Sequence, residues 1–313
     1  MTLRRLATLG PLLALFVAAL FFATQSPRFL TLDNFSLIAQ QVMVVGVLTI
    51  GQTLVILTAG IDLSCGMLMA LGSVTMTLLA GKAGVSPPLA VLLGVGATTL
   101  AGLLNGLLVT RVKLPPFIVT LGTMNIAFAL TQIVSRSQSV TDLPPLLTAL
   151  GETVPVLGTR IAYGTVLMVL LYALAWWLLR ETAGGRHVYA VGNNREAARL
   201  AGIDTERVLL AVYTLAGASY GVAALLAVAR TGVGDPQAGQ TENLDTVTAV
   251  VLGGTSLFGG RGVITGSLVG ALIVGVFRNG LTLMGVSSVY QILVTGILVI
   301  LAVATDQWSR RSA

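Results

Sequence analysis

The stretch Val208–Ala229 reads VLLAVYTLAGASYGVAALLAVA and contains no Asp, Glu, Lys, Arg or His. An apolar run of about 20 residues is long enough for a helix to cross the hydrocarbon core of a bilayer. The rest of the chain repeats this pattern, since 55% of its 313 residues are hydrophobic and only 10% are charged. A soluble domain has roughly 25% charged residues. The composition therefore predicts an all-α, polytopic integral membrane protein with a single transmembrane domain over residues 1–313.

Short polar breaks divide the chain into about ten apolar runs. The first run lacks a small-residue cleavage site, so we expect a retained anchor rather than a signal peptide. The eighth run is short and rich in glycine, which leaves open whether it crosses, tilts or re-enters the membrane. The predicted spans are Leu6–Ala23, Val42–Thr58, Leu63–Ala80, Leu89–Thr110, Phe117–Val134, Ile161–Leu179, Val208–Ala229, Thr246–Phe258, Val263–Met284 and Val289–Thr305.

Basic residues indicate how these spans are oriented. Ten spans would place both termini on one side of the membrane. Lys and Arg gather on that side, at both termini, in Arg111–Lys113 and in Arg180–Arg207. Because cytoplasmic segments collect Lys and Arg, we predict cytoplasmic N- and C-termini and a cytoplasmic loop at about 180–207. The same rule accounts for the net charge of +6, so we expect membrane lipid, and no nucleic acid, around this chain.

The sequence offers no pattern for catalysis or for a bound cofactor. It has no G-x-x-x-x-G-K-[ST] phosphate-binding loop, and its single cysteine excludes a multi-cysteine metal site. The acidic residues Asp62, Glu242 and Asp245 fall at the ends of predicted spans, not at the mid-span positions typical of proton relays. We therefore expect no catalytic residue, no metal and no cofactor. A passive channel, a transporter driven by a partner protein and a membrane scaffold remain as alternatives.

The charged segment Arg180–Arg207 favours the driven transporter. Gly184-Gly185 is expected to turn the chain after the sixth span. Asn193 or Asn194 is suited to cap the start of a short helix, and Gly202 to end it in a left-handed conformation. A short helix outside the membrane, with small alanines among its charges, suits docking into a groove of another protein. An ordinary solvated loop is the alternative.

Several ordered motifs resemble a known family. E-A-A-R-L-A-G, Glu196–Gly202, resembles the E-A-A-x-x-x-G core of the loop by which ABC importer permeases contact their ATPase subunits. The I-x-L-P part of that consensus is absent here. The chain is instead similar to the ribose-type monosaccharide permeases, which share a superfamily with branched-chain amino-acid permeases. Further segments similar to that branch are Thr53–Gly66, Tyr189–Ile203, Leu244–Gly262 and Asn279–Gln291.

The resemblance implies the membrane-spanning subunit of an ABC importer in a bacterial plasma (inner) membrane. Its implied partners are a separate ATPase subunit, expected as fused tandem domains, a periplasmic or lipid-anchored sugar-binding protein, and a second permease copy or homologue. The implied substrate is a ribose-, xylose-, galactose- or rhamnose-like sugar. Branched-chain amino acids, nucleosides or an autoinducer-2 type sugar derivative are the alternatives. The residues implied in ATPase coupling are Asn193, Asn194, Arg195, Glu196, Ala197, Ala198, Gly202 and Asp204.

Polar residues inside or near the spans are candidates for a sugar pathway, because amides and hydroxyls match the hydrogen bonding of a sugar. Bonding between helices is the alternative role for each of them, and helix capping the alternative for Asp62. The pathway candidates are Gln52, Thr53, Asp62, Asn105, Asn125, Thr248, Asn279 and Gln291. At the outer face, Glu242 and Asp245 are expected either to contact the binding protein or to cap the next helix.

Overall fold

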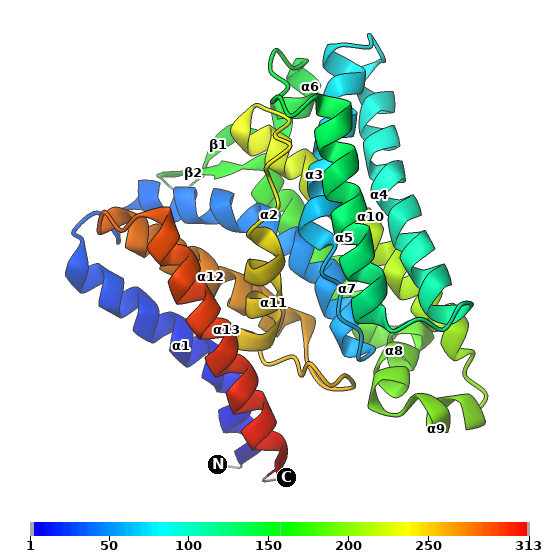
Figure 1. The fold of residues 1–313 in the computed structure, drawn as a ribbon. Coiled ribbons are helices and arrows are strands. Elements are labelled where there is room, and N and C mark those ends of the chain that lie inside the picture. Colours follow the sequence, from blue (N-terminus) through cyan, green and yellow to red (C-terminus); the bar gives the residue numbers. More distant parts are fainter. Residues whose placement is uncertain (1–2, 157, 312–313) are drawn as a thin grey trace.

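A computed structural model describes residues 3–156 and 158–311, and this part of the chain is a bundle of helices (Figure 1). Proline opens both α4 and α5, where its missing N–H is not needed for a helical hydrogen bond. The helices are α1 (Leu3–Gln25), α2 (Leu32–Leu57), α3 (Cys65–Gly81), α4 (Pro87–Thr110), α5 (Pro116–Ser135), α6 (Pro145–Thr148), η1 (Ala149–Gly151), α7 (Tyr163–Glu181), α8 (Ala183–Asn193), α9 (Arg195–Leu200), α10 (Thr205–Thr231), α11 (Glu242–Leu252), α12 (Ile264–Leu283) and α13 (Ser288–Arg311).

The only strands in the described part form one small hairpin. Strand β1 (Thr153–Val156) pairs antiparallel with β2 (Thr159–Ala162), so Ile161 and Ala162 lie in a strand rather than in the predicted sixth span. The hairpin contacts the start of α2, where Thr159 Oγ1 donates to the carbonyl of Leu32 at 3.0 Å. Ser36 Oγ also donates to the carbonyl of Arg160. The hairpin therefore holds the beginning of α2.

Six of the described helices are long and apolar enough to cross a membrane: α2, α4, α5, α7, α10 and α12. Three shorter apolar helical segments, Gly10–Gln25, Cys65–Gly81 and Ser288–Ala304, belong to α1, α3 and α13. The chain is thus a predominantly helical, multi-pass membrane protein. The count of ten spans stays a prediction.

The eighth predicted span is wrong in its bounds. Helix α11 begins at Glu242, before the predicted start, and ends at Leu252. Its 11 residues reach about 16 Å at 1.5 Å per residue, well short of a ~30 Å hydrocarbon core. The helix stops because Gly254 follows in the left-handed region, with φ of 86°. Residues 253–263 then run without helix to the start of α12.

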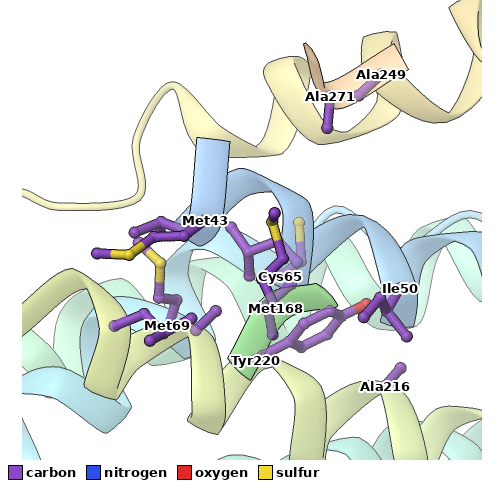
Figure 2. Packing of buried hydrophobic residues seen from close by; sticks show 14 of the residues in the cluster. Met43, Ile50, Cys65, Met69, Met168, Ala216, Tyr220, Ala249 and Ala271 are labelled. Atoms are coloured by element: carbon purple, nitrogen blue, oxygen red, sulfur yellow. The ribbon is translucent and has the colours of Figure 1, made fainter. Parts of the chain in front are cut away.

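The core of the bundle surrounds α10, which packs against α4, α2 and α3. Figure 2 shows part of this core, where Tyr220 of α10 lies among Ile50, Cys65 and Met69. The α10–α4 contact depends on glycine. A Cβ on Gly217 would lie 2.4 Å from the carbonyl oxygen of Thr98, so the two backbones touch directly.

The bundle has two distinct ends (Figure 1). The end that carries α8 and α9, together with the start of α1 and the end of α13, is called the α9 end. The opposite end, which carries the β1–β2 hairpin and α6, is called the hairpin end. The start of α1 and the end of α13 therefore lie at the same end of the bundle as the charged segment. The side chains of Arg4, Arg5, Arg310 and Arg311, which entered the charge argument, lie outside the described part.

Candidate functional site

The charged segment folds into two short helices, α8 and α9, rather than a loop around one helix. Thr182 caps α8 by accepting a hydrogen bond from the N–H of Gly185 at 3.1 Å. The expected turn at Gly184-Gly185 is wrong, because both residues lie inside α8. Gly185 is needed there for space, since a Cβ would meet the carbonyl oxygens of Leu178 and Leu179 within 2.4 Å.

Helix α9 matches the predicted docking helix in its bounds and in both caps. Asn194 caps it by accepting from the N–H of Ala197 at 3.0 Å. At its other end, Gly202 has φ of 86° and donates to Arg199, while Ile203 donates back to Ala198. These two hydrogen bonds form the Schellman arrangement that commonly ends a helix at glycine. The following residue, Asp204, then caps α10 by accepting from the N–H of Arg207 at 3.0 Å.

The two faces of α9 differ. Ala198 is buried and packs with Val191 of α8 and Leu209 of α10, so it points away from any partner. Glu196 and Arg199 form an exposed ion pair at 2.6 Å, and the hydrogen bond from Arg199 lowers the pKa of Glu196. The other predicted coupling residues on this short segment, Asn193, Arg195 and Ala197, are exposed.

Leu200 is the residue that the sequence interpretation missed. It is 74% exposed, at the last position of α9. Leu92, which is 67% exposed, lies on α4, a helix long and apolar enough to cross a membrane, but α9 is not one of these helices. Leu200 therefore adds an apolar side chain to the exposed surface of α9, which also carries the Glu196–Arg199 pair. No periodic signal in a six-residue helix could have singled it out.

A junction of three backbones connects α8 to the rest of the bundle. The N–H of Gly260 donates to the carbonyl of Leu57, the last residue of α2, at 2.9 Å. A Cβ on Gly192, near the end of α8, would lie 1.7 Å from that same carbonyl oxygen. Tyr189 of α8 also donates to the carbonyl of Gly262 at 3.1 Å. We call Leu57, Gly192 and Gly260 the glycine junction.

A buried polar network follows directly after α2. Asp62 accepts hydrogen bonds from the N–H and hydroxyl of Ser64, at 2.8 and 2.5 Å, and from the hydroxyl of Tyr220 at 3.1 Å. Asn105 donates to the Ser64 hydroxyl at 3.3 Å, and Gln52 lies within 3.4 Å of the Tyr220 hydroxyl. Three predicted pathway residues, Gln52, Asp62 and Asn105, therefore meet at one place.

The position of Asp62 corrects the sequence interpretation. It is only 1% exposed and bonds to Tyr220, more than half-way along α10 from the α9 end, so it does not lie at the end of a span. It does not cap α3 either, since Ser64 occupies the cap position. The chain turns back into the bundle after α2, and this return brings the carboxylate inside.

Three other pathway candidates are buried in separate contacts. Thr53 donates to Ser267 of α12 at 2.8 Å, and Asn279 exchanges two amide hydrogen bonds with Asn34, at 2.9 and 3.0 Å. Thr248 bonds to the carbonyl of Leu244 within its own helix. The contacts of Thr53 and Asn279 tie α2 to α12 and are those of the alternative role, bonding between helices, whereas the Thr248 contact lies within α11.

The last two pathway candidates are accessible. Asn125 lies exposed in the middle of α5, and its amide donates to the carbonyl of Leu121 one turn earlier. Gln291 lies half-buried at the start of α13. An amide facing the hydrocarbon would be costly, so the α5 face that carries Asn125 is suited to a cavity or to a protein neighbour.

The two predicted binding-protein contacts differ from each other. Glu242 opens α11, next to Thr241. Asp245 is buried, and its carboxylate pairs with Arg278 of α12 at 3.1 Å. Asp245 therefore does not lie on an exposed surface that a binding protein would cover.

Comparison with known proteins places the chain in a family. The model of the family described as "Branched-chain amino acid transport system / permease component" matches residues 34–303. A fructose import permease of Rhizobium meliloti is 46% identical, over 97% of this chain and 86% of the relative. A ribose import permease of Bacillus subtilis is 42% identical, over 96% and 92%. A D-allose transport system permease of Escherichia coli is 37% identical, over 95% and 90%. No solved structure matches. From its match to the family model and its identity with these relatives over nearly their whole length, the chain belongs to this family of transport-system permease components.

Proposed function

We propose that this chain is the membrane-spanning subunit of an ABC importer for a monosaccharide in a bacterial plasma (inner) membrane. The names of its relatives support a sugar substrate, since they are permeases for fructose, ribose and D-allose. The polar network supports it too, because its amides, hydroxyls and the Asp62 carboxylate can all form hydrogen bonds with the hydroxyls of a sugar. ATP hydrolysis then takes place on a separate ATPase subunit, and a binding protein delivers the sugar from outside.

The exposed face of α9 is the observation that carries this proposal. It combines Leu200 with the Glu196–Arg199 pair on a helix whose caps and buried Ala198 hold it rigidly. A rigid helix with one apolar anchor suits insertion into a groove of the ATPase. We therefore propose that the α9 end is cytoplasmic, that both termini lie there, and that ten segments run between the two ends. The basic residues of Arg180–Arg207 agree with this orientation.

The glycine junction supports a route from the ATPase to the pathway. A displacement of α9 moves α8, and α8 touches both the end of α2 and the loop after α11. Asp62 and its network follow α2 by only a few residues. Motion of α8 against these two segments then opens the sugar pathway alternately to the two sides of the membrane. The exposed α5 face with Asn125 meets that pathway or a second permease copy.

Two alternatives remain. The family description names branched-chain amino acids, so a permease for these compounds, or for nucleosides or an autoinducer-2 type sugar derivative, is the nearest. Measuring which compound the associated binding protein binds separates these cases. A passive channel is the second, and uptake that persists with an inactive ATPase would establish it.

The proposal predicts a large effect of Leu200→Asp. Burying a leucine side chain stabilises a contact by ~1.5–3 kcal/mol. Its loss should therefore reduce ATPase co-purification and sugar uptake about tenfold or more, while the variant folds normally because Leu200 is exposed. Val112→Asp is the matched control, since Val112 is 58% exposed and follows α4 near the start of α10. Normal co-purification and uptake with Leu200→Asp would refute docking through α9.

A further inference from the structure

A cavity of about 260 Å³ opens where α11 and α13 begin and α12 ends. It is distinct from the polar network around Asp62, and none of that network lines it. Ligand pockets for drug-sized molecules span ~300–1,000 Å³, so this cavity fits a compound of about one sugar ring. The side chains that matter below are Thr241, Asp245, Phe277, Arg278, Ser288 and Gln291.

Arg278 supplies the main polar group of the cavity. Its guanidinium donates to Asp245 at 3.1 Å and to Thr241 at 3.3 Å. The Asp245 side chain is 7% exposed, whereas that of Arg278 is 40% exposed. A guanidinium has five N–H donors in a fixed fork. These two contacts therefore orient Arg278 from one side and leave it able to donate to a ligand.

The remaining lining is mixed in the way a sugar requires. Gln291 donates from its amide nitrogen to Thr282 and to the carbonyl of Val286, which leaves its amide oxygen as an acceptor. Ser288 adds a hydroxyl. Phe277 and aliphatic side chains supply an apolar wall, which suits the C–H face of a sugar ring. The Arg278–Asp245 pair carries no net charge, so the cavity favours a neutral polyhydroxyl ligand over an ion.

A structural role alone accounts poorly for Arg278. An arginine inside a membrane-spanning helix is costly and usually marks a ligand or ion site. Arg278 lies five residues before the end of α12, within a helix long and apolar enough to span. We propose that this cavity is a low-affinity binding site for a single monosaccharide, oriented by Arg278, Gln291 and Ser288. The inference rests on the proposed function and names where the chain itself contacts the sugar.

Cysteine labelling tests the site directly. Cys65 is the only native cysteine and is buried, so Ile292→Cys, at a lining residue that is 48% exposed, introduces one accessible thiol into the cavity and leaves Arg278, Gln291 and Ser288 in place. We expect D-ribose, D-fructose or D-allose at millimolar concentration, without a binding protein, to slow the reaction of this thiol with a methanethiosulfonate reagent several-fold. Ser139→Cys, exposed outside the cavity, is the matched control and should show no protection. Labelling of Ile292→Cys that none of the three sugars slows would overturn the site.

A second variant separates ligand binding from helix pairing. Arg278→Lys keeps the charge beside Asp245 but loses the fork that bonds two groups at once. We expect Arg278→Lys to abolish the protection of the cavity cysteine by the sugars and to reduce uptake about tenfold. Co-purification with the ATPase should stay normal. Exposed Arg28→Lys should change neither. Uptake by the wild-type protein in the same cells tests the proposed function independently of the cavity. Uptake that is present with wild type, and equal in Arg278→Lys, would overturn the site while leaving the proposed function intact.

Discussion

Glycine brings backbones into contact in two regions of this molecule, with different surroundings. At the α4–α10 interface, Gly102 and Gly217 face each other in the middle of two long helices. At the glycine junction, Gly192 and Gly260 meet the last residue of α2 at the ends of elements. The first contact involves regular helix on both sides. The second involves a helix end and the non-helical residues 253–263.

From this difference we expect glycine to serve stability in the first region and transmission in the second. Two helices packed through glycine along their length cannot separate at one point without losing the rest of the contact. This contact therefore stabilises the whole bundle. Helix ends and loops open locally at lower free energy. A clash at the junction can therefore be relieved by moving a few residues, which changes how α8 sits against α2 without unfolding the protein.

The largest expected effect is that of Gly217→Ala on folding. The new methyl would lie 2.4 Å from the carbonyl oxygen of Thr98, which is backbone and cannot rotate away. We expect a loss of about 1–3 kcal/mol or more in the free energy of unfolding, measured by thermal denaturation in detergent. Gly96→Ala on α4 is the control, because nothing lies within 4 Å of its Cβ. Equal stability of the two variants would break the comparison.

Gly192→Ala should act on transport more than on folding. Its methyl would lie 1.7 Å from the carbonyl oxygen of Leu57, so α8 must shift away from α2. We expect sugar uptake to fall about tenfold while the ATPase still co-purifies, because α9 itself is unchanged. Gly184→Ala, also on α8, meets only the Thr182 hydroxyl at 3.6 Å and should transport normally. If Gly192→Ala instead loses the folded protein as Gly217→Ala does, the junction has no separate role.

The smallest expected effect concerns the cap of α9, beyond the junction. Asn194→Ala removes the hydrogen bond to the N–H of Ala197, and loss of such a cap costs about 1 kcal/mol. We expect uptake to fall a few-fold, since α9 forms less often in its docking conformation. Asn194→Ser, which retains a side-chain oxygen, should restore most of it. A wild-type rate for Asn194→Ala would mean that docking does not need a preformed helix.

Much of the fold could be predicted because the bilayer leaves a strong signal in the sequence. The run Val208–Ala229 lies inside α10, and the local chemistry of Asn194 and Gly202 predicted both ends of α9. Helix α8 could not be predicted in the same way. Its two early glycines have low helix propensity, and packing against the end of α7 overrides that preference.

The candidate site was predicted only where its residues are close in sequence. Asp62 was placed at a span end because it follows an apolar run, and nothing local shows that the chain returns into the bundle beside Tyr220. The partnership of Asp245 with Arg278 joins residues on different helices and leaves no pattern. Nothing local in the sequence distinguishes Gly192 from Gly217. That distinction depends on which backbone each one meets.

Attachments at both of its ends would allow α2 to act as a lever. The hairpin fixes one end of α2 through Ser36 and Leu32, and the glycine junction takes hold of the other end at Leu57. The 26 residues between these attachments form a rod of about 39 Å. Each degree of tilt about the hairpin displaces the far end by about 0.7 Å, as that length implies. A displacement of an ångström or two at α8 then corresponds to a tilt of α2 by only a few degrees. Residues nearer the hairpin are displaced proportionately less.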